Sequence, residues 1–242
     1  MKKMVLAAAA GLAALTFASA GQAAVVITAG GGAQTFTVNY NGYINEVLQP
    51  GLTGTGVFSL SGVDTTNANY DVWSFNTTVT NTSGTPVSAS RISILAFDLA
   101  DALHSTRGSS PGIFGATIGS GSLPQAISGP AYDICFRAGG GGGNCTGGGG
   151  GGVLSAVLPN APVAYTSTLN FRLAKSASSA TQLTFNRFGV RYQSINYGNV
   201  KDDSGVGLGT VVPEPSSWML MIVGFGLIAQ QLRRRSRAAA AV

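Results

Sequence analysis

The sequence predicts an all-β body, a β-sandwich with jelly-roll connections as one form of it, carrying an N-terminal signal helix and a C-terminal hydrophobic helix. Three observations indicate strands. Apolar and polar residues alternate, the alternating runs are rich in threonine, valine and aromatic residues, and polar turns separate them. Alternation with a period of two is typical of strands with one buried face. No repeat of fixed period is present, which argues against a β-solenoid.

The clearest alternation puts Val163, Tyr165, Leu169, Phe171 and Leu173 on one face. A turn over 81–86 predicts a hairpin, another polar turn covers 64–67, and the one expected helix of the body is short. That helix covers Asp98–His104, and the predicted strands are Val25–Thr28, Gln34–Tyr40, Gly56–Ser61, Asp71–Val79, Ser88–Phe97, Val153–Leu158, Val163–Leu173, Leu183–Phe185 and Phe188–Ile195.

The charge of the chain is concentrated at its ends. The 242 residues are 45% hydrophobic and 10% charged, with one histidine and a formal net charge of +5. Between Gly21 and Val212, however, eight basic residues balance eight acidic ones. Because nucleic-acid binding needs a clustered basic face, we expect no nucleic-acid partner. A single histidine excludes a multi-histidine metal site, and we expect no metal and no cofactor.

Residues 1–23 have the features of a secretory signal peptide. Lys2 and Lys3 precede an apolar run over Val5–Phe17, and small residues follow, so signal peptidase is expected to cut after Ala20 or Ala23. The alternative is a membrane anchor, but the apolar run is shorter than the roughly 20 residues that a bilayer core requires.

Residues 211–242 form a second targeting segment, which has three parts. Pro213, Glu214 and Pro215 come first, an apolar segment over 218–232 follows, and the basic residues Arg233, Arg234, Arg235 and Arg237 end it. As a helix the apolar segment is roughly 22 Å long, and Trp218 and the arginines extend its reach as a transmembrane helix. The arginines should remain cytoplasmic, which places the body outside. Residues 24–210 are then the folded domain.

This order resembles the PEP-CTERM sorting signal of Gram-negative bacteria, in the subtype with Pro-Glu-Pro-x-x-Trp. That subtype has alanine after the tryptophan, where this chain has Met219. The resemblance covers about 25 of the 242 residues. It implies cleavage near Pro-Glu-Pro by an exosortase, an inner-membrane intermediate, and transfer to the surface or release, typically in producers of exopolysaccharide. A permanent anchor is the alternative.

A glycine-rich loop spans 139–152, with 11 glycines in 14 positions, and we expect it to be a mobile surface loop. Cys135 and Cys145 bracket its first half, and in an exported protein they most simply form a disulfide. A metal or redox pair lacks further ligands or Cys-x-x-Cys spacing. Cys135-Phe136, the glycines, Asn144-Cys145 and the run over 191–195 resemble the cistern family of sorted proteins, which implies no activity for any residue.

The one catalytic candidate is Asp98-x-x-Asp101-x-x-His104, which a helix would place on one face, with Ser105 or Ser109 as nucleophile. The alternative is a solvated turn capped by Asp98, and the chain has no Gly-x-Ser-x-Gly elbow. We therefore expect no enzyme.

Two kinds of binding site are further candidates. A Ca²⁺ site could use Asp64, Asp71, Asp202 and Asp203, although the spacing of a calcium loop is missing. Most aromatic residues alternate as core residues do, which leaves three tyrosines for glycan contact. The threonine-rich faces resemble flat ice-binding arrays, but they are too short and unrepeated to indicate one. The tyrosines are Tyr43, Tyr132 and Tyr197, and the threonines are Thr35, Thr37, Thr78, Thr80 and Thr82.

The favoured function is an exported cell-surface or extracellular-matrix protein with a structural or adhesive role linked to exopolysaccharide or biofilm. A glycan-binding or ice-binding module is the alternative, and a secreted hydrolase is the least favoured.

Overall fold

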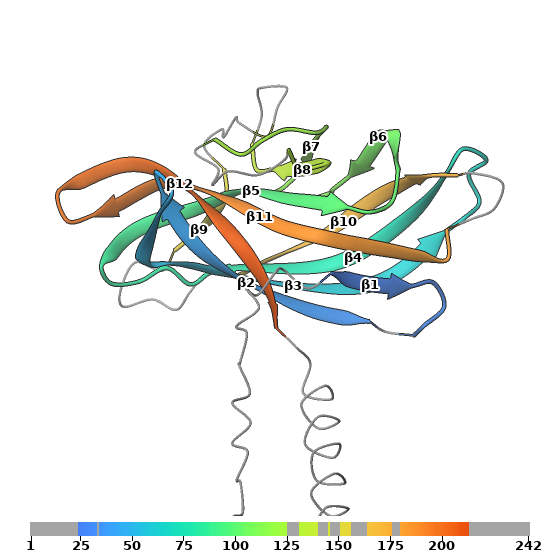
Figure 1. Ribbon diagram of the computed structural model, residues 1–242, viewed down its shortest axis with the longest axis horizontal. Helices are drawn as coiled ribbons and strands as arrows, with labels where there is room; N and C mark the ends of the chain where they lie inside the picture. The colour runs from blue at the N-terminus through green and yellow to red at the C-terminus, as the bar shows by residue number, and fades with distance from the viewer. Residues whose placement is uncertain are drawn as a thin grey trace, which may run out of the picture.

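The computed structural model describes residues 24–32, 34–124, 131–139, 145, 151–155, 164–175 and 180–212. Strands dominate this part of the chain, and they confirm the predicted all-β class (Figure 1). The strands are β1 (Val25–Thr28), β2 (Thr35–Ile44), β3 (Val47–Asp64), β4 (Tyr70–Asn81), β5 (Val87–Leu99), β6 (Leu103–Ser109), β7 (Ala116–Ile118), β8 (Ile134–Arg137), β9 (Val153–Leu154), β10 (Ala164–Ala174), β11 (Gln182–Tyr197) and β12 (Val200–Val212).

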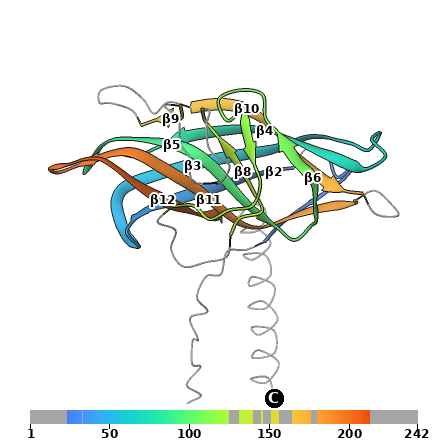
Figure 2. The same cartoon turned by 90° about the horizontal axis from the view of Figure 1, so that it is seen from above.

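All twelve strands belong to one antiparallel sheet with the order β6-β10-β4-β3-β2-β12-β11-β5-β8-β7, while β1 pairs with β11 and β9 with β5. The sheet curls into a flattened, nearly closed shape (Figure 2). Its two ends approach each other where the Arg107 guanidinium of β6 donates a hydrogen bond to the carbonyl of Asp133, just before β8, at 2.9 Å. The predicted sandwich of two separate sheets is therefore not what the hydrogen bonding shows.

The turn over 81–86 is the reason why one sheet can enclose one core. β4 and β5 follow each other along the chain, yet they do not pair: β4 pairs with β3 and β10, whereas β5 pairs with β11, β8 and β9. The predicted hairpin is thus wrong, because this turn carries the chain across the core to the opposite side of the curled sheet. The turn over 64–67 does join two paired strands, β3 and β4.

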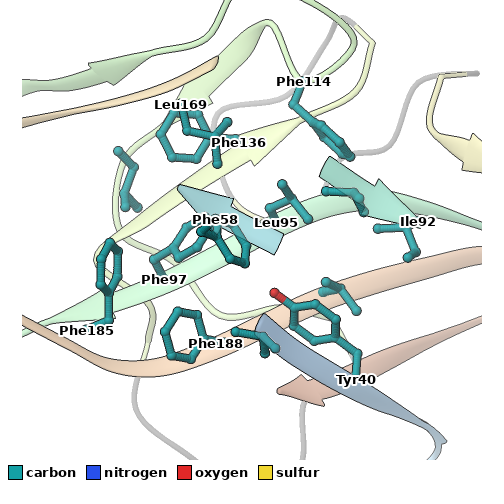
Figure 3. Packing of buried hydrophobic residues seen from close by; sticks show 14 of the residues in the cluster. Tyr40, Phe58, Ile92, Leu95, Phe97, Phe114, Phe136, Leu169, Phe185 and Phe188 are labelled. Carbon is teal, nitrogen blue, oxygen red and sulfur yellow. The ribbon is translucent and has the colours of Figure 1, made fainter. Parts of the chain in front are cut away.

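Phenylalanine rings fill the interior (Figure 3). Phe97 of β5 lies at their centre, with its ring centroid 5.2 Å from Phe171 and 5.9 Å from Phe136, both in edge-to-face contact. Burying each ring contributes on the order of 1.5–3 kcal/mol. Because strands from all around the sheet supply them, the rings hold its opposite sides together; they are Phe36, Phe58, Phe75, Phe97, Phe136, Phe171, Phe185 and Phe188.

The strand predictions succeeded where apolar side chains alternate, and the observed β1, β2, β4, β5 and β10 agree closely with them. The observed β3 and β11 are much longer than predicted, and four strands were missed: β6, β7, β8 and β12. The helix predicted over Asp98–His104 is wrong. Strand β5 continues to Leu99, which is buried and pairs with Phe185, and β6 already begins at Leu103.

A disulfide joins Cys135 of β8 to Cys145, as predicted, and both residues are fully buried. Most of the glycine-rich loop between and after them lies outside the described residues, as do the predicted signal peptide over 1–23 and the hydrophobic segment over 218–232. The described part of the chain contains no helix with the length and apolar character needed to cross a membrane.

Candidate functional site

The structure separates the three predicted catalytic residues. Asp98 lies near the end of β5, and the Asp101 carboxylate accepts a hydrogen bond from the Thr184 backbone N–H at 2.7 Å. The His104 ring lies on β6 beside Tyr70, with ring centroids 4.8 Å apart, and its Nδ1 is 3.0 Å from the Thr106 hydroxyl. Strand geometry turns neighbouring positions to opposite faces, so no helical face gathers these side chains. The predicted arrangement is not formed.

Asp98 instead meets Asp133, a residue that the sequence analysis did not single out. The Asp98 pKa is raised to about 6, first by burial and then by the hydrogen bond and negative charge of Asp133. Arg187, with Nε 3.6 Å from the Asp98 carboxylate, works in the opposite direction. The Asp133 carboxylate also accepts a hydrogen bond from the Leu99 backbone N–H at 2.8 Å. The pair fastens the segment before β8 onto β5, which is a structural task.

A small cavity of about 210 Å³ lies beside this pair, lined by Asp101, Arg107 and Asp133 among others. Each of these polar groups already has a partner within the fold: Asp101 binds the Thr184 N–H, and Arg107 binds the Asp133 carbonyl. Neither Ser105 nor Ser109, the two candidate nucleophiles, lines this cavity. The Ser109 hydroxyl accepts a hydrogen bond from the Asn170 side-chain amide at 3.2 Å. The cavity therefore offers hydrogen-bonding groups but no paired nucleophile and base.

The acidic residues proposed for calcium are dispersed. The Asp64 carboxylate accepts hydrogen bonds from the backbone N–H and hydroxyl of Thr66, and buried Asp71 forms an ion pair with Lys175 at 3.1 Å. Asp202 and Asp203 lie in β12, where Asp203 accepts a hydrogen bond from the Tyr197 hydroxyl at 3.3 Å. Across the described ranges, no group of three or more histidine, cysteine or acidic residues could hold a metal ion.

The three tyrosines named for glycan contact do not form a platform. Tyr132 is buried, and the Arg187 guanidinium lies 4.2 Å from the centre of its ring. Tyr197 is half-buried beside Asp203, and Tyr43 packs against the cluster that contains the disulfide. Of the residues expected in the core, Tyr40, Trp73 and Tyr192 are fully enclosed, whereas Tyr165 is 39% exposed.

The two ends of the body meet at one place. At its C-terminal end β12 lies against β2, with Val211 opposite Val38 and Val212 opposite Thr37. Further back, Leu208 of β12 pairs with Gly189 of β11, and β1 takes over the same edge of β11, where Val25 pairs with Phe185. The first residues of β1 and the last of β12 are accordingly close together on the underside of the body (Figure 1).

The functional assignment depends on the sequence at the end of β12. Residues 211–237 match the PEP-CTERM protein-sorting motif. No curated protein matches the chain, and no solved structure matches it. The PEP-CTERM motif implies that the protein is exported, sorted to the cell surface and processed by an exosortase.

The PEP-CTERM motif begins inside the folded body. Its first two residues, Val211 and Val212, belong both to the matched range and to β12. The predicted recognition residues Pro213, Glu214, Pro215 and Trp218, and the basic residues Arg233, Arg234, Arg235 and Arg237, lie within the motif but outside the described residues. The Pro-Glu-Pro-x-x-Trp subtype and the likeness to the cistern family remain predictions.

Proposed function

We propose that this chain is an exported cell-surface or extracellular-matrix protein whose tail is removed by an exosortase and whose body has a structural or adhesive, non-enzymatic role. The observation that carries the proposal is the PEP-CTERM motif at residues 211–237, which begins in the last two residues of the last strand of the body. Removal of the tail would leave every strand of the sheet in place.

The position of the two ends fits a membrane-held precursor. A signal peptide over 1–23 and a hydrophobic segment over 218–232 would leave the body at neighbouring points, because Val25 and Leu208 occupy successive stretches of the same edge of β11. Both segments can then lie in one membrane without straining the sheet. The arginines after residue 232 would stay in the cytoplasm and the body would face outward.

The non-enzymatic role is supported by how the ionisable residues are used. Asp71, Asp101 and Asp133 hold backbone or side-chain groups of the fold, and His104 contacts a tyrosine and a threonine. A structural or adhesive protein needs a stable body rather than a reactive centre, and these contacts serve stability. An association with exopolysaccharide or biofilm is part of this proposal.

The test expresses the full chain in Gram-negative cells with and without an exosortase and measures its mass. We expect signal peptidase to remove the first 20 or 23 residues in both strains, and the tail to be lost near residues 213–215 only where the exosortase is present. Glu214→Gln should slow removal of the tail, whereas Glu46→Gln, which alters the one other glutamate, should not. An intact tail in exosortase-containing cells would contradict the proposal.

A further inference from the structure

One face of the sheet is built almost entirely of uncharged polar side chains. It consists of the outward-facing positions of β2, β3, β4 and β10, which the strand register arranges in rows across the four strands. We call these twelve positions the polar grid; its rows are Thr35–Ser59–Asn76–Thr168, Thr37–Val57–Thr78–Thr166 and Asn39–Thr55–Thr80–Ala164. Ten of the twelve are threonine, serine or asparagine, and all twelve are exposed or half-buried. Figure 2 shows β3, β4 and β10 side by side.

The polar grid carries no charge. The charged residues of these four strands are Asp64, Asp71 and Arg172, and the register places all three together beyond one end of the grid. Only 10% of the chain is charged, and none of that charge falls on the twelve positions of the grid. A charged ligand would therefore find no counterion here, whereas a neutral ligand loses no hydration of charged groups when it binds.

A groove runs over the centre of the grid. A cavity of about 630 Å³ is lined by grid residues from β3, β4 and β10, with Pro111 and Gly112 at its rim. Among the described residues, the side chains of Asn76, Thr78 and Thr166 form no hydrogen bond within the protein. These groups can bind an external partner.

We propose that the polar grid binds a neutral polysaccharide. Each threonine hydroxyl both donates and accepts hydrogen bonds, as sugar hydroxyls do. Strands about 4.8 Å apart and alternate residues about 6.7 Å apart make the grid roughly 14 Å by 13 Å, which accommodates a short run of sugar rings. The β-branched threonines have restricted χ1 rotamers, so little side-chain entropy is lost on binding.

Some of the grid is already fixed in place. The hydroxyls of Thr35 and Ser59 are 2.8 Å apart, and the Thr55 hydroxyl donates to the Asn39 amide oxygen at 3.3 Å. No aromatic residue stands in the grid, so a single contact with a sugar chain is weak. A long polymer that engages many copies of the protein gains through avidity. The inference deepens, and rests on, the adhesive role proposed above.

The test uses the purified full chain in a detergent without a sugar headgroup and measures its binding to immobilised polysaccharides by interferometry. The panel contains dextran, galactomannan and mixed-linkage β-glucan as neutral polymers and alginate as the anionic one. We expect binding to at least one neutral polymer that changes less than twofold between about 50 and 500 mM salt, because no ion pair is involved. Asn76→Lys and Thr166→Lys, both at exposed grid positions, should each weaken it at least tenfold.

Asn186→Lys is the matched control, since Asn186 is also an exposed strand asparagine but lies on β11, outside the grid. It should leave binding unchanged. Three outcomes would overturn the inference: no binding to any neutral polymer, binding to alginate alone, or full binding by both grid variants. Thermal hysteresis without polysaccharide binding would instead assign the grid to ice. Tail processing is measured separately, in cells. A failure of polysaccharide binding therefore does not affect the sorting proposal, and a failure of tail processing does not affect the binding proposal.

Discussion

Val212 lies opposite Thr37 of β2 as the last paired residue of β12, and the Pro-Glu-Pro segment begins at the next position. A protease binds its substrate as extended, unpaired chain on both sides of the bond that it cuts. Here the residues that precede the segment are held in the sheet, since β12 pairs with β11 as far as Leu208 and with β2 from Val206 to Val212. The body therefore limits how closely an exosortase can approach from the N-terminal side.

This geometry predicts that a spacer speeds up processing. Insertion of Gly-Ser-Gly-Ser after Val212 moves the Pro-Glu-Pro segment away from the sheet, and we expect the ratio of processed to unprocessed protein in a pulse-chase experiment to rise several-fold. The same four residues inserted at the exposed turn of Gly198 and Asn199 should have no effect. Equal or slower processing with the spacer would show that the strand end itself is part of what the protease recognises.

The disulfide between Cys135 and Cys145 predicts a measurable loss of stability on reduction. Opening a loop of about 11 residues should lower the free energy of unfolding by roughly 2.5–3 kcal/mol on the chain-entropy estimate. Denaturant unfolding of the oxidised protein and of the Cys135→Ala/Cys145→Ala variant gives the difference. Reductant should change the unfolding midpoint of the wild-type protein and leave that of the variant where it is.

The Asp98–Asp133 pair predicts a pH dependence of stability. The folded-state pKa of Asp98 is about 6, above its ordinary value of 3.8, so the folded protein holds more protons than the unfolded chain between these values. The contribution of Asp98 to stability is therefore highest below about pH 4 and falls as the pH rises to about 6. Asp98→Asn removes the ionisation, and at pH 7 it should stabilise the protein by about 1 kcal/mol, a figure reduced because the carboxyl partly contacts water.

Asp64 supplies the opposite case as a control. Hydrogen bonds from the backbone N–H and hydroxyl of Thr66 lower its pKa, so its contribution is present above pH 4 and lost as the pH falls below that. Asp64→Asn should therefore lower the thermal unfolding midpoint at pH 7, while Asp98→Asn raises it. Two variants that shift the midpoint in the same direction at pH 7 would show that the Asp98 and Asp133 carboxyls do not share their site as described.

How far the sequence predicts this molecule depends on which side chains mark each strand. β4 and β10 were predictable because Trp73, Phe75, Leu169 and Phe171 stand at alternate positions and face the core. The contact between Asp98 and Asp133 could not be predicted, because the register of β5 with β8 depends on a crossover that no local sequence pattern encodes. The polar grid was out of reach for the same reason: short threonine runs are visible in the sequence, but their alignment across four strands is a property of the register.

The sequence pattern did not predict β12 as a strand, because its positions that face the core are glycines rather than apolar residues. In place of apolar side chains it presents Gly205, Gly207 and Gly209 to the core. At Gly207 a Cβ would lie 2.5 Å from Cγ2 of Val190 and 2.8 Å from Cε2 of Tyr192. Buried aromatic residues of the neighbouring strands occupy the space that side chains on β12 would otherwise take.

Gly207→Ala is therefore expected to destabilise the body by overpacking, by about 1–3 kcal/mol. The added methyl group meets atoms of two side chains on β11 that are both fully buried. Gly62→Ala on β3 is the matched control, since nothing lies within 4 Å of the position that its Cβ would take, and its effect should stay within about 0.5 kcal/mol. Urea unfolding of both variants measures the difference. If Gly207→Ala proved as stable as Gly62→Ala, the close packing of β12 between Tyr40 and Tyr192 would be wrong, and with it the argument that glycine holds the place of core side chains in the strand that leads into the sorting motif.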